Sequence, residues 1–235
     1  KGMKFRFYWL TVRQTVDLIG FDACLMATYE VAQNLEPVAH TLLASEELEP
    51  GHGWDWSQVA APGGEISTVD LATAITDGFA AQSVDYGTSG ITLSLVDLGR
   101  LDGIDSAFDA MTAAVGADAA GLVGRIASER GDALGFGRDP DPAYDLHMVD
   151  IGHLASLLTD VDGMAAAAAE LEAAVDEAVL VNVTDSPTAQ ARGLAVYFPP
   201  LADLGVPSYE EVADIGPWTG FLGAYYTGAE GVPSE

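Results

Sequence analysis

Four short stretches of the chain are apolar along most of their length, and each is bounded by glycine, proline or polar residues. They are VDLIGFDA at 16–23, AHTLLAS at 39–45, GITLSLVDL at 90–98 and GLAVYFP at 193–199. Strands with one face in water alternate apolar and polar residues, whereas strands covered on both faces are apolar throughout. The sequence therefore predicts a sheet that is covered by helices on both faces.

Segments with helical spacing separate these strands. Cys24 is followed at once by apolar residues at helical spacing, which predicts a helix over 25–35 that Pro37 stops. Further helices are expected at 68–86, 101–115, 118–130, 150–159 and 162–180, with two short helices within 208–226. Strands that alternate with helices are typical of an α/β protein with a largely parallel sheet.

Composition limits the class of protein and its partners. With 235 residues, of which 49% are hydrophobic, the chain can bury a core, and we expect one domain over 17–235. A net charge of −27 repels phosphate backbones, so nucleic acid is not expected as a ligand. No uncharged apolar stretch is long enough to span a membrane. Residues 1–16 hold four of the nine basic residues and no acid, which indicates an atypical segment or linker.

Cys24 is the single cysteine of the chain, so an intrachain disulfide and a cysteine-based metal cluster are excluded. It lies where a strand is expected to end and a helix to begin, and this edge of an α/β sheet commonly opens into a binding crevice. A thiolate there could attack a carbonyl, and the helix N-terminus would favour the thiolate. The alternative is a small buried hydrophobic residue, which is a common environment for cysteine.

The residues around Cys24 resemble a known family. DLIGFDACLMATYEVA at 17–32, followed by the strand end ASEE and the loop EPGHGWDW, resembles the clostripain-like cysteine peptidases, which are α/β proteins of the caspase type. Three later segments, ITLSLVDLGRL, GLAVYFP and WTGFLGAYY, are similar to later segments of that family. The resemblance covers about residues 17–226.

This resemblance implies a caspase- or gingipain-like fold: a mostly parallel sheet flanked by helices and incomplete at its N-terminus. It implies a cysteine endopeptidase that cuts after arginine or lysine, with Cys24 as the nucleophile and Asp22, Glu49 and His52 as substrate-binding residues. A strand-end cap is the alternative role for Asp22. His52 stands where basic-specific relatives commonly have an acid, and a solvated loop residue is its alternative role.

The family's general base is a histidine on the strand before the cysteine strand, but all four histidines here follow Cys24. Two explanations remain. The chain is a maturation product that works with an N-terminal fragment carrying the histidine, or it is the product of a truncated gene that lacks that strand. In both cases we expect little activity from this chain alone. His52 acting as a substitute base is a further alternative. A non-catalytic scaffold that binds cationic peptides, or an inactive fragment, is the alternative function. The resemblance implies peptide or protein substrates with basic residues and an extracellular location.

No cofactor is expected from the sequence. The segment GRDPDPAYD at 137–145 has oxygen ligands suited to calcium but lacks the spacing of an EF-hand, and a solvated loop is the alternative. His147, Asp150 and His153 lie within seven residues, but on a helix the third would turn away from the first two. Helix capping or a buried histidine explains them better than a zinc site.

Overall fold

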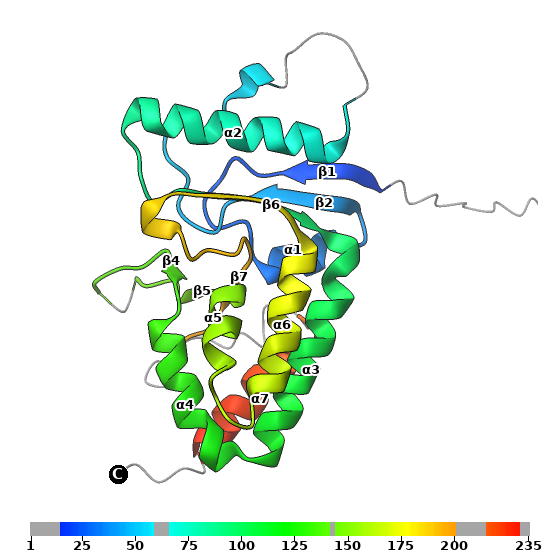
Figure 1. The fold of residues 1–235 in the computed structure, drawn as a ribbon, viewed down its shortest axis with the longest axis vertical. Helices are drawn as coiled ribbons and strands as arrows, with labels where there is room; N and C mark the ends of the chain where they lie inside the picture. The colour runs from blue at the N-terminus through cyan, green and yellow to red at the C-terminus, as the bar shows by residue number, and fades with distance from the viewer. Residues whose placement is uncertain (1–14, 59–65, 142–143, 201–214, 231–235) are drawn as a thin grey trace, which may run out of the picture.

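The structure, a computed structural model, describes residues 15–58, 66–141, 144–200 and 215–230. Most of the predicted basic segment 1–16 therefore lies outside the described residues, as does the 208–214 part of the predicted helical tail. The strands form two sheets (Figure 1), one in the order β1-β2-β3-β6 and one in the order β4-β5-β7. Their bounds are β1 Val16–Gly20, β2 Ala39–Ala44, β3 Thr92–Asp97, β4 Gly135–Phe136, β5 Met148–Asp150, β6 Val179–Thr184 and β7 Ala195–Tyr197.

The predicted α/β architecture, a sheet flanked by helices, is confirmed, but the strand directions differ from the prediction. Among the described strands, β1 and β2 pair in parallel, whereas β2 with β3, β3 with β6 and the pairs of the smaller sheet are antiparallel. Ala44 at the end of β2 faces Ser94 near the start of β3. The connection through helix α2 (Thr68–Tyr86) thus brings the chain to the end of β2, and β3 runs antiparallel to β2 from there.

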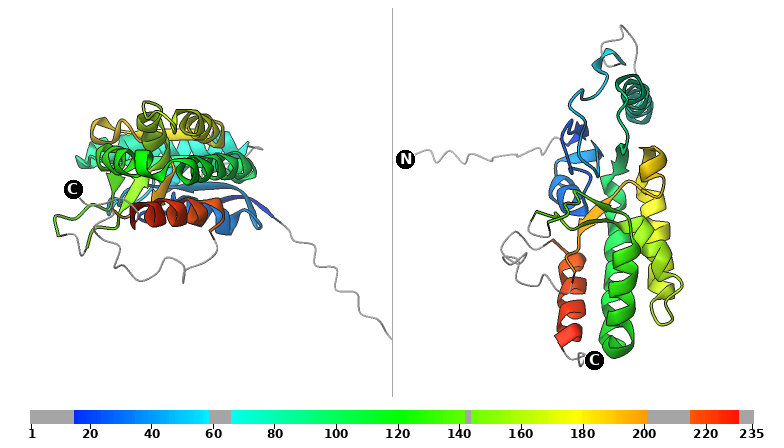
Figure 2. Two further views of the ribbon diagram at one scale, coloured as in Figure 1. Left: turned by 90° about the horizontal axis from the view of Figure 1, so that it is seen from below. Right: turned by 90° about the vertical axis from the view of Figure 1, so that its left-hand side faces the viewer.

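The helices lie on both sides of the larger sheet, with α2 above it in Figure 1 and the others below it. They are α1 Tyr29–Leu35, α2 Thr68–Tyr86, α3 Leu101–Ala117, α4 Ala119–Asp132, α5 Ile151–Leu158, α6 Ala165–Ala178 and α7 Pro217–Glu230, with short 3₁₀ turns η1 Trp56–Gln58, η2 Leu98–Arg100 and η3 Ser186–Thr188. Helix α3 lies between α6 and α7 (Figure 2). Aromatic side chains fill its contact with α7, where the fully buried Trp218 contacts both Phe108 and Phe198. This core fixes the strand ends from which the site is built.

Two helix predictions show which local signals were sufficient. The helix predicted over 68–86 has these bounds in the structure, because the Ser67 hydroxyl accepts from the Asp70 N–H and Gly87 ends the helix in the left-handed conformation. The helix predicted over 162–180 is shorter, and the strand β6 after it was not predicted. The β-branched residues of VLVNVT pair with β3, which overrides the helical pattern before them.

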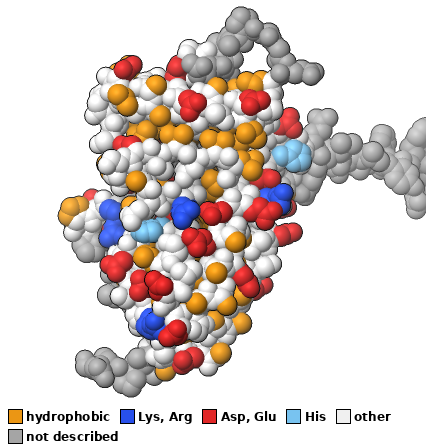
Figure 3. Space-filling view, viewed as in Figure 1, with side chains coloured by type: hydrophobic (Ala, Val, Ile, Leu, Met, Phe, Trp, Pro, Cys, Tyr) orange, Lys and Arg blue, Asp and Glu red, His pale blue; other side chains and the backbone are white. Residues whose placement is uncertain are grey.

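Acidic side chains are spread over the face drawn in Figure 3, where basic side chains are few. None of the described helices combines the length and the apolar character needed to cross a bilayer.

Candidate active site

Cys24 is exposed and lies in the turn that joins β1 to α1, at the edge of the sheet where β1 ends. The prediction that it begins a helix is wrong. Helix α1 begins only at Tyr29, and its N-cap is Thr28, whose hydroxyl accepts from the Val31 N–H. The positive end of α1 is therefore already capped and separated from Cys24, so it gives no argument for the reactivity of the thiol.

The turn that carries Cys24 is held by backbone hydrogen bonds on two sides. The Leu25 N–H donates to the Glu47 carbonyl at 3.1 Å, and the Ala27 N–H donates to the Ser45 carbonyl at 2.8 Å. On the other side, the Ala195 N–H of β7 donates to the Ala27 carbonyl at 2.9 Å. The position of Cys24 thus depends on residues 45–47 and on β7.

Leu25, directly after Cys24, has a φ of 58°. The left-handed region is uncommon for residues other than glycine and carries strain of about 1–3 kcal/mol, so surrounding contacts must hold it. Besides its backbone bond to Glu47, Leu25 lies against the β4–β5 loop, where a Cβ on Gly137 would be 3.2 Å from Leu25 Cδ1. A strained backbone next to the thiol is typical of a functional site.

The Sγ of Cys24 accepts a hydrogen bond from the Glu49 N–H at 3.2 Å. Within the described part of the chain, which includes all four histidines, no imidazole is hydrogen-bonded to this sulfur. The backbone N–H of Cys24 likewise donates to no described acceptor, so it is available to a ligand. The thiol is therefore accessible and is held by the Glu49 N–H, but no described residue is in position to act as its general base.

Two of the predicted substrate-binding residues, Asp22 and Glu49, are brought together by the loop after β2. The Oδ2 of Asp22 accepts from the Trp54 backbone N–H and from the Trp56 indole, both at 3.2 Å. The Oε1 of Glu49 accepts from the Trp54 indole at 3.1 Å. Trp54 therefore bridges the two carboxylates, and Asp22 joins the loop to the Cys24 turn rather than capping its own strand.

Gly53 makes this approach of Asp22 to the loop possible. Its φ is +64°, and a Cβ at this position would lie 2.9 Å from Asp22 Oδ2. Any other residue would be strained and would push the carboxylate away from the Trp54 N–H.

Glu49 has one oxygen in use and one that is unpaired. Its Oε2 is buried and has no hydrogen-bond partner among the described residues. Burial, reinforced by the charge of Asp22 and partly offset by the Trp54 hydrogen bond, raises the pKa of Glu49 to about 7. The carboxyl is thus poised to change charge near neutral pH and to gain from a cationic ligand.

His52, the third predicted substrate-binding residue, is attached to α2. Its Nδ1 lies 3.0 Å from Gln82 Nε2, its Nε2 lies 3.4 Å from Ser83 Oγ, and its ring stacks on Tyr86 with a centroid distance of 5.0 Å. These contacts fix the loop between β2 and α2. They show His52 as an anchor of one wall and give no support to its use as a substitute base.

The other histidines serve local structure. Their ring contacts are Thr15 Oγ1 for His40, Asp145 Oδ1 for His147, and the Leu134 N–H, which donates to His153 Nδ1. His147 directly precedes β5 and His153 lies in α5, so they do not share one helix. In the described residues, no group of three His, Cys, Asp or Glu side chains is arranged to hold a metal ion. Part of the segment 137–145 lies outside that description.

A buried carboxyl pair behind the Cys24 turn was missed by the sequence reasoning. Glu46 is 1% exposed and its Oε2 accepts from the Gly193 N–H at 3.0 Å. Asp150 is fully buried and accepts from the N–H groups of Arg192 and His153, both at 2.6 Å. The strand end ASEE and the N-cap position of Asp150 were the available signals, but neither indicates that the two side chains meet.

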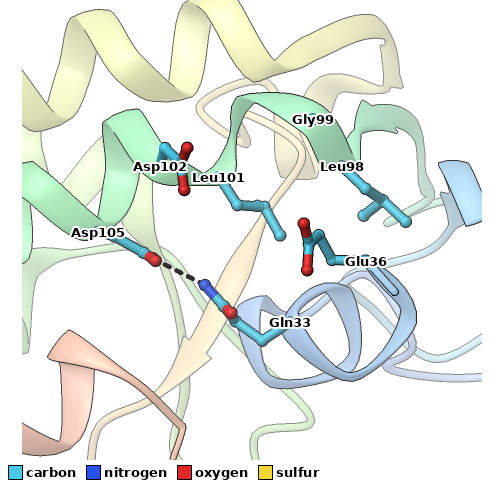
Figure 4. A pocket seen from close by; sticks show the side chains of 7 residues that line it. All are labelled: Gln33, Glu36, Leu98, Gly99, Leu101, Asp102 and Asp105. Carbon is cyan, nitrogen blue, oxygen red and sulfur yellow. Dashed lines mark hydrogen bonds between the residues drawn. The ribbon is translucent and has the colours of Figure 1, made fainter. Parts of the chain in front are cut away.

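A small pocket of about 140 Å³ lies at the other edge of the larger sheet (Figure 4). Its lining consists of Gln33, Glu36, Leu98, Gly99, Leu101, Asp102 and Asp105. These residues follow the end of β3 and precede the start of β2, whereas Cys24 lies where β2 ends. The pocket is therefore separate from the Cys24 site.

Comparison with known proteins gives the same relatives by sequence and by structure. Residues 8–131 match the sequence profile of the clostripain family. Clostripain of Hathewaya histolytica is 41% identical over 71 residues, which cover 26% of this chain and 14% of that protein. The chain thus matches a small part of this relative's length.

Solved structures show the same fold at low sequence identity. A clostripain from Bacteroides thetaiotaomicron, in complex with the peptide inhibitor BTN-VLTK-AOMK, superposes with a TM-score of 0.62 at 17% identity, covering 88% of each chain. An inactive zymogen C11 protease from Parabacteroides distasonis has a TM-score of 0.66 at 16% identity, covering 88% of this chain and 59% of that one. A secreted C11 cysteine protease of B. thetaiotaomicron is similar, with a TM-score of 0.61 at 17% identity over 88% of this chain and 56% of that one.

Proposed function

The chain belongs to the clostripain family of cysteine peptidases, and on this basis we propose that it carries the nucleophile of an endopeptidase that cuts after arginine or lysine. One observation carries the proposal. The exposed Cys24 lies at the end of a sheet strand, in a strained turn fixed from two sides, with the carboxylate of Asp22 in the same turn and that of Glu49 on the adjoining loop. A structural cysteine would be expected in the core instead.

The reaction follows from this geometry. The Sγ of Cys24 attacks the carbonyl carbon of the scissile bond, and the electron pair of the C=O bond moves to oxygen. The Cys24 N–H, which donates to no described backbone acceptor, then donates to that oxyanion. A histidine base accepts the thiol proton, the C–N bond breaks as the oxyanion's electron pair re-forms the C=O bond, and the amine leaves with that proton. Water then hydrolyses the thioester, which releases the carboxylate and restores the thiol. The Glu49 N–H holds the sulfur in place before the attack.

The general base is a histidine from outside these 235 residues. Strand β1 is paired on one side by β2, and no described strand pairs with its other edge. Its residues are half-buried or exposed, with Val16 47% exposed, whereas β2 is almost entirely buried. An added strand would cover β1 and reach the edge at which Cys24 lies, so a histidine at that point would reach the sulfur.

Specificity rests on Asp22 and Glu49. A substrate guanidinium or ammonium group can bind the exposed carboxylate of Asp22, and the ionised carboxyl of Glu49 nearby adds attraction for that cation. His52 contributes by anchoring that loop to α2. The inhibitor bound to the B. thetaiotaomicron clostripain contains the peptide VLTK, which ends with lysine. A secreted relative also supports an extracellular location for this protein.

The test is covalent labelling with a lysine-ending acyloxymethylketone peptide. The chain would be expressed alone and together with the polypeptide encoded before Lys1, with Cys24→Ala as the control. We expect Cys24 to be labelled in the co-expressed protein, far more slowly in the chain alone, and not in the control. A glutamine-ending probe of the same length should label at least about tenfold more slowly.

Two results would overturn the proposal. Equal labelling of both forms would contradict an external base. Absence of labelling, together with reversible binding of a lysine-rich peptide, would favour the scaffold that binds cationic peptides without cutting them.

A further inference from the structure

The carboxyl groups of Glu46 and Asp150 are neighbours because they bind consecutive amides. Asp150 accepts from the Arg192 N–H and Glu46 accepts from the Gly193 N–H. Both side chains are buried, with exposed fractions of 0% and 1%. Two ionised carboxylates that are neighbours in a buried site would repel each other strongly.

No described cation neutralises the pair. The guanidinium of Arg192 turns away and pairs with Glu172 and Asp176 on α6. Glu46 Oε1 is buried and has no hydrogen-bond partner among the described residues. A carboxylate oxygen in that position needs a proton to become a donor.

We propose that Glu46 and Asp150 share one proton and act as positioning residues for the Cys24 turn. The shared proton leaves a single negative charge, which the N–H groups of Arg192, Gly193 and His153 stabilise.

The pair lies between the two segments that hold the turn. Glu46 stands between Ser45 and Glu47, whose carbonyls accept from Ala27 and Leu25. Its side chain binds Gly193, two residues before Ala195, which donates to the Ala27 carbonyl. Losing the Glu46 contact would therefore loosen both sides of the turn together.

The proton belongs chiefly to Glu46. Burial, and then the charge of Asp150, raises the pKa of Glu46 well above its usual value. Burial also raises the pKa of Asp150, but three hydrogen bonds favour its ionised form and partly offset this effect. The other ionisable groups that face the pair are Glu47 beside Glu46 and His153 in the first turn of α5, whereas Arg192 contributes only its backbone N–H.

The raised pKa of Glu46 links the pair to pH. An acid with a raised folded-state pKa binds its proton more tightly in the folded protein, so its stabilising effect is complete below the unfolded pKa of about 4.3. The effect is lost as pH rises through the folded pKa of Glu46. Ionisation would separate the two carboxyls and displace the turn, so turnover should fall on the alkaline side.

The test compares Glu46→Gln, which resembles the protonated acid, with Glu46→Ala, and uses Glu172→Gln as a matched control that removes a nearby acid outside the pair. Infrared spectra at neutral pH, recorded for every form in a Glu49→Gln background because Glu49 itself has a pKa of about 7, should show a protonated carboxyl in the parent and in the control, and not in Glu46→Gln. Denaturant unfolding of Glu46→Gln should depend less on pH than that of the wild type. A carboxyl band that persists in Glu46→Gln, or an unchanged pH dependence of unfolding, would overturn the shared proton.

The positioning role rests on the proposed peptidase activity. It is measured on the complete protein, meaning this chain co-expressed with the polypeptide that supplies the histidine. Glu46→Ala should lower kcat roughly 10- to 100-fold with little change in KM, whereas Glu46→Gln should keep kcat and remove its alkaline decline. Equal kcat in all three variants would overturn the positioning role. If the complete protein cuts no peptide, the proposed function fails, while the infrared and unfolding results still decide the shared proton.

Discussion

Two carboxyl pairs flank the Cys24 turn, and they differ in what covers them. Asp22 and Glu49 lie on the loop side, where indole and amide N–H groups satisfy part of their oxygens and Glu49 Oε2 has no described partner. Glu46 and Asp150 lie behind the turn, fully buried and bound to backbone amides. The same chemical group can therefore bind a cationic ligand on one side and hold the backbone on the other, depending on burial.

The largest effect is expected at the buried pair. Asp150→Ala removes the N-cap of α5 and leaves the N–H groups of Arg192 and His153 without acceptors, so the free energy of unfolding should fall by about 3 kcal/mol. Urea denaturation measures it, with Asp102→Ala, at an exposed position of α3, as the control. A loss no larger than that of the control would remove the distinction between the two pairs.

At the open pair, the loss should appear in substrate binding. Asp22→Asn should reduce kcat/KM for arginine and lysine substrates about 10- to 100-fold, because a charged acceptor for the substrate cation is lost. An uncharged residue at the same substrate position should show little change. Steady-state kinetics on matched peptides would decide it, and an equal loss on both would mean that Asp22 acts only by holding the loop.

Glu49 should make the open pair sensitive to pH near neutrality. Below its pKa of about 7 the carboxyl is neutral, and above it the carboxylate attracts a cation. KM for a lysine substrate should therefore fall by up to about tenfold between pH 6 and pH 8, and Glu49→Gln should remove this dependence. Identical KM profiles for the variant and the wild type would exclude Glu49 from the specificity site.

The smallest effect is expected at His52. Its contacts with Gln82 and Ser83 anchor the loop to α2, so His52→Ala should lower the free energy of unfolding by about 1 kcal/mol. The pH profile of kcat should stay as in the wild type, with Gln82→Ala as the matched variant. A profile that loses one of its titrating limbs in His52→Ala, but not in Gln82→Ala, would instead identify His52 as a base.

The elements that the sequence predicted well are those whose ends are marked by capping residues, glycine or polar residues. Helix α2 begins after Ser67 and ends at Gly87, and β2 lies within its predicted range because its apolar run is short and bounded. The predicted start of α1 was wrong because Ala27, inside the predicted helix, forms backbone hydrogen bonds with Ser45 and Ala195 instead. Tertiary hydrogen bonds overrode the local pattern there, as they did for the strand β6.

The site was predictable only in part. Asp22 is close to Cys24 in the sequence, and the resemblance to the clostripain family pointed to Glu49. The described contacts join all three residues through the loop after β2. Asp150 meets Glu46 only because the smaller sheet packs behind the Cys24 turn. Such a contact depends on tertiary packing, which cannot be predicted from local residue patterns alone.

The most direct measurement is the trapping of the acyl-enzyme. The complete protein would be mixed with a lysine-ending peptide ester, quenched with acid within one turnover, and digested for mass mapping. The account predicts a thioester of the lysine peptide on Cys24, and none in Cys24→Ala. Product formation in Cys24→Ala, or an acyl group on any other residue, would contradict it.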